Sequence, residues 1–169
     1  SIICNDVRIV NGEIQVKGTN VTKGYYKRDD LTREAFDGEW FKTGDAGYID
    51  EKGQIFITGR LKNVIILDNG KNIYPEEIEE ILQTYEEVEE CIVFQDVNKK
   101  KQSVVAVVFY FGDLDQNNEL AEFIINDINM RLPSYMAITN YYLSSTPLVK
   151  TSSNKINRNM VIKNIHSIR

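Results

Sequence analysis

The hydrophobic pattern of this chain changes at residues 60–63, and this change limits what the chain can fold into. Before it, alternating apolar and polar residues flank two short turns, Asn11-Gly12 and residues 50–53. Such turn residues tolerate positive φ and are typical of β-hairpins. After it, apolar residues recur at helical spacing between strand-like runs. The sequence therefore predicts two pieces of different architecture.

The first piece, residues 1–61, is predicted to be a small antiparallel β subdomain. Its two hairpins are joined by a segment with room for one helical turn at residues 31–35. A sheet of this size seldom buries enough apolar surface to be stable alone. We therefore expect it to pack against a further part of the protein.

The second piece, residues 62–169, is predicted to be a compact α+β domain with a three-stranded sheet. Pro75 suits the first position of a helix, and the glutamates after it suit the positive end of the helix dipole. Helices packed on one small sheet give an α+β unit. The later segments follow in the order strand 88–97, strand 102–111, helix 120–132, strand 140–145 and helix 159–168.

The overall composition excludes some classes of protein. With 27% charged and 42% hydrophobic residues the chain is typical of globular proteins, and no apolar run is long enough to span a membrane. The formal net charge of −5 argues against a nucleic-acid partner. Cys4 and Cys91 lack the spacing of a zinc site and are predicted to be free thiols in a reducing cytoplasm. The chain begins without methionine, so we expect it to be part of a longer protein.

Two charged residues at the open end of the second hairpin are candidates for a binding site. Asp45 follows Thr43-Gly44, and a carboxylate there can accept two hydrogen bonds from a diol such as a ribose. Arg60 is predicted to lie beside it on the partner strand. The alternatives are a turn or cap for Asp45 and a surface ion pair with Arg60, worth roughly 0–1 kcal/mol.

Lys155 is the second candidate, in the segment PLVKTSSNKINRN. Hydroxyl and amide side chains around a lysine offer donors for phosphate or carboxylate oxygens. The segment lacks the glycines of a Walker phosphate loop. The alternative is a solvated basic loop before the last helix. We assign no role to His166 and no metal ligand to any residue.

Five segments occur in a fixed order: GEIQVKGTNVTKGYYKRDDLT, WFKTGD, GYIDEKGQIFITGRLKNVIILDNGKNIYPEEIE, RLPSYM and PLVKTSSNKINRN. Together they resemble the C-terminal part of the adenylate-forming acyl-CoA synthetase superfamily, which also holds luciferases and the adenylation domains of peptide synthetases. The similarity covers essentially all 169 residues. The segment NVIILDNGKNIYPEEIE looks most like the long-chain fatty acyl-CoA synthetase branch.

The resemblance implies a role for each candidate residue. Residues 1–61 would end the large AMP-binding domain, and residues 62–169 would form its C-terminal lid. Asp45 and Arg60 would bind the ribose hydroxyls of ATP and of the acyl adenylate, and Lys62 would be the hinge. Lys155 would stabilise negative charge during adenylation.

After the lid turns about Lys62, the loop with Asn69, Gly70 and Lys71 would line the tunnel for the pantetheine thiol of coenzyme A. One departure from the family pattern is Asn154, where a glycine usually precedes the lysine. Asparagine tolerates left-handed backbone, so we expect the loop to keep its shape.

The resemblance therefore predicts part of an ATP-dependent acid–thiol ligase that activates a carboxylate, expected to be a long-chain fatty acid, as acyl-AMP and transfers it to coenzyme A. ATP, coenzyme A and Mg²⁺ would take part, with the magnesium site outside this chain, which alone would be inactive. One alternative is an enzyme that loads the phosphopantetheine arm of a carrier protein. The other is a non-catalytic interaction module of the same fold.

Overall fold

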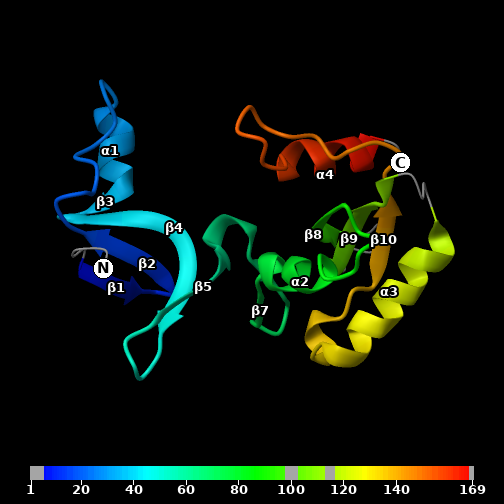
Figure 1. Ribbon diagram of the computed structural model, residues 1–169. Coiled ribbons are helices and arrows are strands. Elements are labelled where there is room, and N and C mark those ends of the chain that lie inside the picture. The colour runs from blue at the N-terminus through cyan, green and yellow to red at the C-terminus, as the bar shows by residue number, and fades with distance from the viewer. Residues whose placement is uncertain (1–5, 98–102, 113–116, 168–169) are drawn as a thin grey trace. The chain divides into compact units, whose positions relative to one another are not determined.

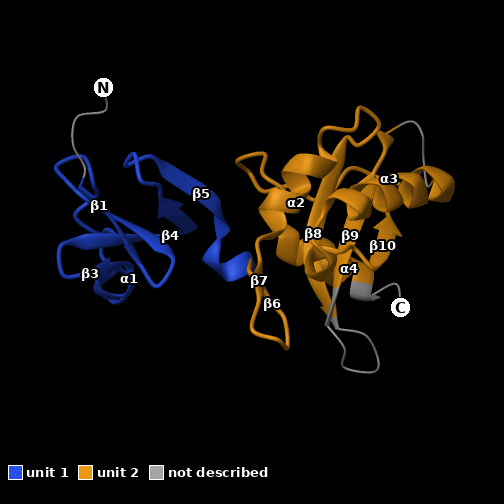
Figure 2. Ribbon diagram, turned by 90° about the horizontal axis from the view of Figure 1, so that it is seen from below, with its two compact units in different colours: residues 1–63 blue, residues 64–169 orange. Residues whose placement is uncertain are grey.

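The computed structural model describes residues 6–97, 103–112 and 117–167 (Figure 1). Its contacts divide the chain into two compact units, residues 1–63 and residues 64–169 (Figure 2). We refer to them as unit 1 and unit 2. Cys4 and the side chain of His166 lie outside what the structure describes.

Unit 1 is a five-stranded antiparallel sheet. Strands β1 (Asp6–Val10) and β2 (Glu13–Lys17) form the predicted first hairpin, and β4 (Trp40–Ile49) and β5 (Ile55–Arg60) form the second. The strand order is β1-β2-β4-β3, and β5 also pairs with β4. The remaining elements are α1 (Asp29–Ala35), β3 (Phe36–Asp37) and the 3₁₀ turn η1 (Leu61–Asn63).

Strand β4, ten residues long, has three neighbours in the sheet. It pairs with β2, β3 and β5, and its register shifts between Ala46 and Gly47. A Cβ atom at Gly47 would lie 2.2 Å from the carbonyl oxygen of Phe56 and 2.7 Å from Cδ1 of Ile14. Only glycine fits where the strands come so close.

Unit 2 contains the predicted three-stranded sheet. Strands β8 (Glu90–Val97) and β9 (Ser103–Tyr110) are antiparallel, and β10 (Asn140–Leu143) runs parallel to β9. The helices are α2 (Pro75–Leu82), α3 (Asn118–Arg131) and α4 (Arg158–Ser167), with a 3₁₀ turn η3 (Ser134–Met136). The predicted α+β class is therefore confirmed. Among the described residues, no helix is long and apolar enough to cross a membrane.

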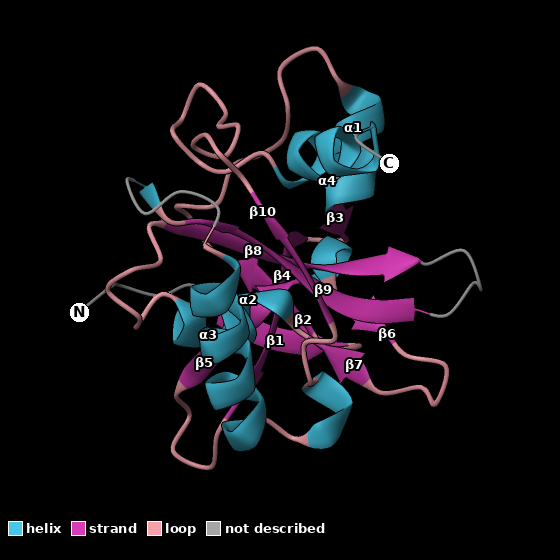
Figure 3. Ribbon diagram, turned by 90° about the vertical axis from the view of Figure 1, so that its right-hand side faces the viewer, coloured by secondary structure: helices cyan, strands magenta, loops and turns pink. Residues whose placement is uncertain are grey.

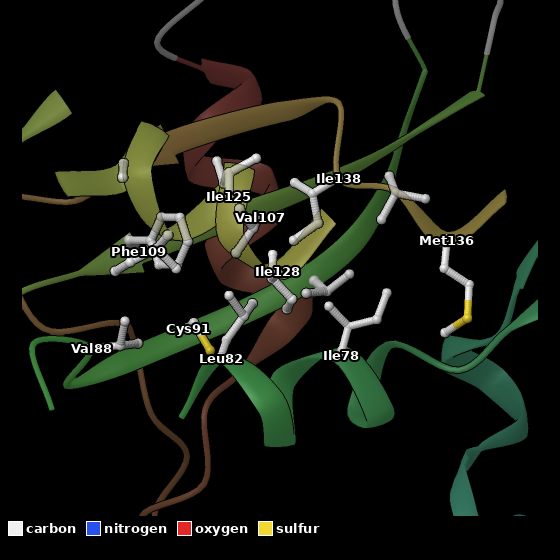
Figure 4. Close-up of a cluster of buried hydrophobic side chains, with 14 of the residues drawn as sticks. Ile78, Leu82, Val88, Cys91, Val107, Phe109, Ile125, Ile128, Met136 and Ile138 are labelled. Atoms are coloured by element: carbon white, nitrogen blue, oxygen red, sulfur yellow. The ribbon is translucent and has the colours of Figure 1, made fainter. Parts of the chain in front are cut away.

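Both faces of the unit 2 sheet are buried, because successive residues of a strand point to opposite sides. One face packs against α2 and α3, which lie next to each other (Figure 3). Figure 4 shows Ile78 and Leu82 of α2 and Ile128 of α3 in this cluster. The other face packs against Leu148, Ile156 and α4. Residues of β8 and β9 on the first face are Cys91, Val93, Val105, Val107 and Phe109, and those on the second are Ile92, Phe94, Ala106 and Val108.

Two local features are not evident from the sequence. Helix α2 ends at Leu82, although Tyr85 continues its apolar period: the N–H groups of Thr84 and Tyr85 donate to carbonyl oxygens three residues before them, and the Tyr85 hydroxyl donates a hydrogen bond to Asp127. The apolar run after residue 63 forms a two-stranded pair, β6 (Ile65–Ile66) with β7 (Asn72–Ile73), which the sequence did not reveal. As predicted, Cys91 is a free thiol, and burial raises its pKa to about 12.

Candidate functional site

Asp45 and Arg60 lie opposite each other on β4 and β5 of unit 1. Arg60 Nε is 3.0 Å from Asp45 Oδ1, and its Nη1 donates to the carbonyl oxygen of Thr43 at 2.9 Å. The Asp45 side chain is 28% exposed and that of Arg60 48% exposed. An ion pair this open is worth about 0–1 kcal/mol, so its contribution to stability does not explain it. Both groups are accessible to a ligand.

The backbone around Asp45 is held by Thr43 and by Glu13, a residue that no local pattern marks. The Thr43 hydroxyl donates to the carbonyl oxygen of Ile14 at 2.7 Å and accepts from the Asp45 N–H at 3.0 Å. Gly44, at φ +71°, donates its N–H to the Glu13 carboxylate at 3.1 Å. Glu13 and Thr43 therefore fix the direction in which the Asp45 side chain leaves the strand.

Lys62 is exposed and lies in η1, next to the boundary between the two units at residues 63 and 64. No described contact ties its side chain to another group. Its role as a hinge stays a prediction.

Asn69, Gly70 and Lys71 form the exposed turn between β6 and β7. Gly70 donates its N–H to the carbonyl oxygen of Leu67 at 2.8 Å and has a φ of +77°, which favours glycine. The Asn69 side chain accepts from the Lys71 N–H at 3.0 Å. The Lys71 ammonium lies 4.2 Å from the ring centre of Tyr135 in η3, a cation–π contact. The turn therefore has a defined shape.

Lys155 lies in a tight hairpin of unit 2, one residue before Ile156 at its base. Lys150 and Ile156 pair across its base, and Asn157 donates its N–H to the carbonyl oxygen of Val149 at 2.7 Å. Thr151 donates its N–H to the carbonyl oxygen of Lys155 at 2.8 Å, and its hydroxyl accepts from the Lys155 N–H at 3.3 Å. The loop is ordered by its own hydroxyls and presents an exposed lysine.

Asn154 has a φ of +58°, so the expected left-handed backbone before Lys155 is observed. We expect Asn154→Ala to destabilise unit 2 by about 1 kcal/mol, because the left-handed backbone costs alanine more free energy than it costs asparagine. Native-state hydrogen exchange of the β8 and β9 amides measures this. As a control, Asn126→Ala, within α3, should be neutral or stabilising since alanine is the better helix former. Equal losses for both variants would contradict the backbone argument.

Two carboxylates anchor the Lys155 hairpin, and both were missed in the sequence. Glu90 contacts the segment that enters the hairpin, through the Leu148 N–H and the Lys150 ammonium. Glu79 pairs with Arg158 at the start of α4 and accepts from the Val93 N–H at 2.6 Å, while Arg158 donates to the Val93 carbonyl oxygen at 2.8 Å. Burial raises the pKa of Glu79, although Arg158 opposes this rise.

The exposed groups of the candidate site are of types that bind organic ligands. Within the described residues, no group of three or more histidine, cysteine, aspartate or glutamate side chains could hold a metal ion. The exposed groups are a carboxylate with an arginine in unit 1, and a lysine on a hydroxyl-rich hairpin in unit 2. These can bind hydroxyls and phosphate or carboxylate oxygens.

Residues 77–155 match the family described as AMP-binding enzyme C-terminal domain. The chain is 37% identical over 164 residues to a 2-succinylbenzoate–CoA ligase of Listeria innocua, covering 96% of this chain and 33% of the relative. A 2-succinylbenzoate–CoA ligase of Oceanobacillus iheyensis is 47% identical over 110 residues, covering 65% of this chain and 23% of the relative. The chain thus spans at most about a third of these curated relatives.

Solved structures of an O-succinylbenzoate coenzyme A synthetase from Bacillus subtilis have a similar fold. The complex with ATP and magnesium ion has a TM-score of 0.79 and 29% identity, over 94% of this chain and 34% of that one. The complex with the acyl-adenylate intermediate has a TM-score of 0.80 and 30% identity, over 92% and 33%. These relatives are named for succinylbenzoate, so the comparisons do not support the expected long-chain fatty acid branch.

Proposed function

We propose that this chain, whose residues 77–155 match the AMP-binding enzyme C-terminal domain, is part of an adenylate-forming acid–CoA ligase that acts on 2-succinylbenzoate. The observation that carries the choice of acid is the 37% identity, over 96% of the chain, to a ligase named for it. The remaining two thirds of the enzyme would correspond to the part of the relatives that this chain does not cover. Residues 1–61 would close the large domain, and residues 62–169 would be its lid.

The proposed reaction has two steps. A carboxylate oxygen of the acid attacks the α-phosphorus of ATP, the bond to the β-phosphate oxygen breaks, and pyrophosphate leaves. The sulfur of coenzyme A then attacks the carbonyl carbon of the acyl-AMP, and AMP leaves. Negative charge develops on phosphate oxygens in both steps, at the α-phosphate in the first and on the departing AMP in the second. The cationic and hydroxyl-rich groups of this chain suit such oxygens.

Asp45 and Arg60 would hold the ribose throughout. The accessible Asp45 carboxylate would accept hydrogen bonds from the two hydroxyls, and the contacts from Thr43 and Glu13 support its fixed direction. Lys155 would donate to the carboxylate and α-phosphate oxygens as negative charge builds up in the first step.

The second step would use other residues of the chain. Lys62 would be the hinge that exchanges the two arrangements, and the turn with Asn69, Gly70 and Lys71 would line the path of the pantetheine thiol. The cation–π contact between Lys71 and Tyr135 supports a turn of fixed shape. Mg²⁺ would neutralise phosphate charge of ATP, and we assign it no ligand among the described residues of this chain.

The test is an assay of the full-length protein with ATP, coenzyme A and one acid at a time. With 2-succinylbenzoate we expect pyrophosphate release and the CoA thioester, with kcat/KM at least about 100-fold above that for palmitate, because a pocket shaped for one acid rejects another of different shape and polarity. A preference for palmitate would restore the long-chain assignment.

The same assay, repeated with a phosphopantetheinyl carrier protein in place of coenzyme A, tests the acceptor and the non-catalytic alternative. If the adenylate forms but the acyl group is transferred only to a phosphopantetheinyl carrier protein, that protein is the acceptor in place of coenzyme A. Failure to release pyrophosphate with any carboxylic acid would favour an interaction module.

A further inference from the structure

The side chain of Glu90, the first residue of β8, lies at the base of the Lys155 hairpin. It is 13% exposed, and its two oxygens have different partners. Oε2 accepts from the Leu148 N–H at 2.6 Å, and Oε1 is 2.5 Å from the Lys150 ammonium. Since 58 residues separate Glu90 from Leu148, this contact joins the sheet to a distant segment of the chain.

The two partners of Glu90 fix the segment that leads into the hairpin. Leu148 is buried in the cluster on the second face of the sheet. Lys150 pairs with Ile156, the residue directly after Lys155. The position of the Lys155 backbone therefore follows from the position of Lys150.

The contacts of Glu90 are stronger than those of a surface ion pair. The hydrogen bond from Leu148 is charge-assisted, the contact with Lys150 is an ion pair, and the carboxylate is largely shielded from water. Removal of Glu90 would leave the Leu148 N–H without its acceptor and the Lys150 ammonium without its partner. The hairpin would keep its internal bonds through Thr151 but lose its tie to β8.

We propose that Glu90 is a positioning residue for Lys155: it ties the base of the hairpin to the sheet so that the lysine reaches the reacting oxygens in the adenylation step. This inference rests on the proposed function. Glu90 touches no substrate in this scheme, and it acts only through Lys155. Displacement of a charged group by about 1 Å can cost on the order of 100-fold in rate.

The experiment measures the two half-reactions separately in the full-length protein. Adenylation is followed by pyrophosphate release, and thioester formation is followed from pre-formed acyl-AMP and coenzyme A. We expect Glu90→Ala to slow adenylation about 10- to 100-fold and to change thioester formation less than about 3-fold. Glu90→Gln keeps an acceptor for the Leu148 N–H but loses the ion pair, so its loss should be smaller, about 3- to 10-fold. Glu87→Gln, at an exposed glutamate nearby, is the matched control and should have no effect.

A double-mutant cycle decides between positioning and a general structural role. In the Lys155→Ala background, Glu90→Ala should slow adenylation less than about 2-fold further, because there is no lysine left to position. Equal losses in both half-reactions, or full additivity with Lys155→Ala, would overturn the proposal. If Glu90→Ala does not fold, an unchanged rate of adenylation in Glu90→Gln would also overturn the proposal. A Lys155→Ala variant with normal adenylation would instead reject the proposed role of the lysine itself.

Discussion

Replacement of Lys155 by alanine in the full-length enzyme should slow adenylate formation about 100- to 1000-fold, the cost of removing one preorganised donor from a developing oxyanion. Transfer of pre-formed acyl-AMP to coenzyme A should stay within about 3-fold of the parent, because in the proposed scheme the lid has turned about Lys62 and Lys155 no longer reaches the reacting oxygens in that step. The measurement is pyrophosphate release for the first half-reaction and thioester formation for the second.

Lys52→Ala is the control for this experiment. Lys52 is exposed in the turn between β4 and β5, and its only described contact is through its backbone N–H. It should leave both half-reactions unchanged. If Lys155→Ala impairs thioester formation as strongly as adenylation, the lysine acts on the fold or on both steps, and its proposed role fails.

Replacement of Arg158 by alanine should destabilise unit 2 by about 3–5 kcal/mol at neutral pH, because it leaves the buried Glu79 carboxylate without its cation. The contact joins residues 79 positions apart and ties the start of α4 to α2 and β8. Hydrogen exchange of the β8 and β9 amides, corrected for the intrinsic rate at each pH, measures the loss. Arg131→Ala is the matched control, since its exposed pair with Asp127 is worth only about 0–1 kcal/mol.

The loss in Arg158→Ala should depend on pH in a defined direction. Burial already raises the pKa of Glu79, and loss of the opposing Arg158 raises it further. A carboxyl whose pKa is raised by folding adds stability while it is protonated, below its unfolded pKa of about 4.3, and loses it as the pH rises through the folded pKa. The deficit should therefore be small near pH 4 and largest above pH 7. A deficit that grows toward low pH would contradict this account.

Local signals in the sequence were sufficient for most of the fold. Asn11-Gly12 and the turn at residues 50–53 identify both hairpins of unit 1, because the backbone angles of such turns restrict the residues that can occupy them. The paired position of Asp45 and Arg60 follows directly from the second hairpin. The β6–β7 pair has only two residues in each strand, too few to show a period.

The supporting contacts of the candidate site could not be predicted in the same way. Glu13, Glu79 and Glu90 look like ordinary surface glutamates in the sequence. Their partners, Gly44, Arg158 and Leu148, are 31 to 79 residues away, and nothing in the local pattern marks the contact. Tertiary packing alone decides which glutamate is buried and what it holds.

Strands β8 and β9 each contribute to two hydrophobic clusters, one on either side of the sheet, and this restricts how the chain can change in length. Inserting one residue within β9 would reverse the facing of every residue beyond it, so Val107 and Phe109 would exchange sides with Val108. Side chains of the wrong size would then enter both clusters at once, on the α2–α3 side and on the α4 side. Insertions and deletions in related sequences should therefore fall in the connections, while the strands keep their length and vary only by substitution.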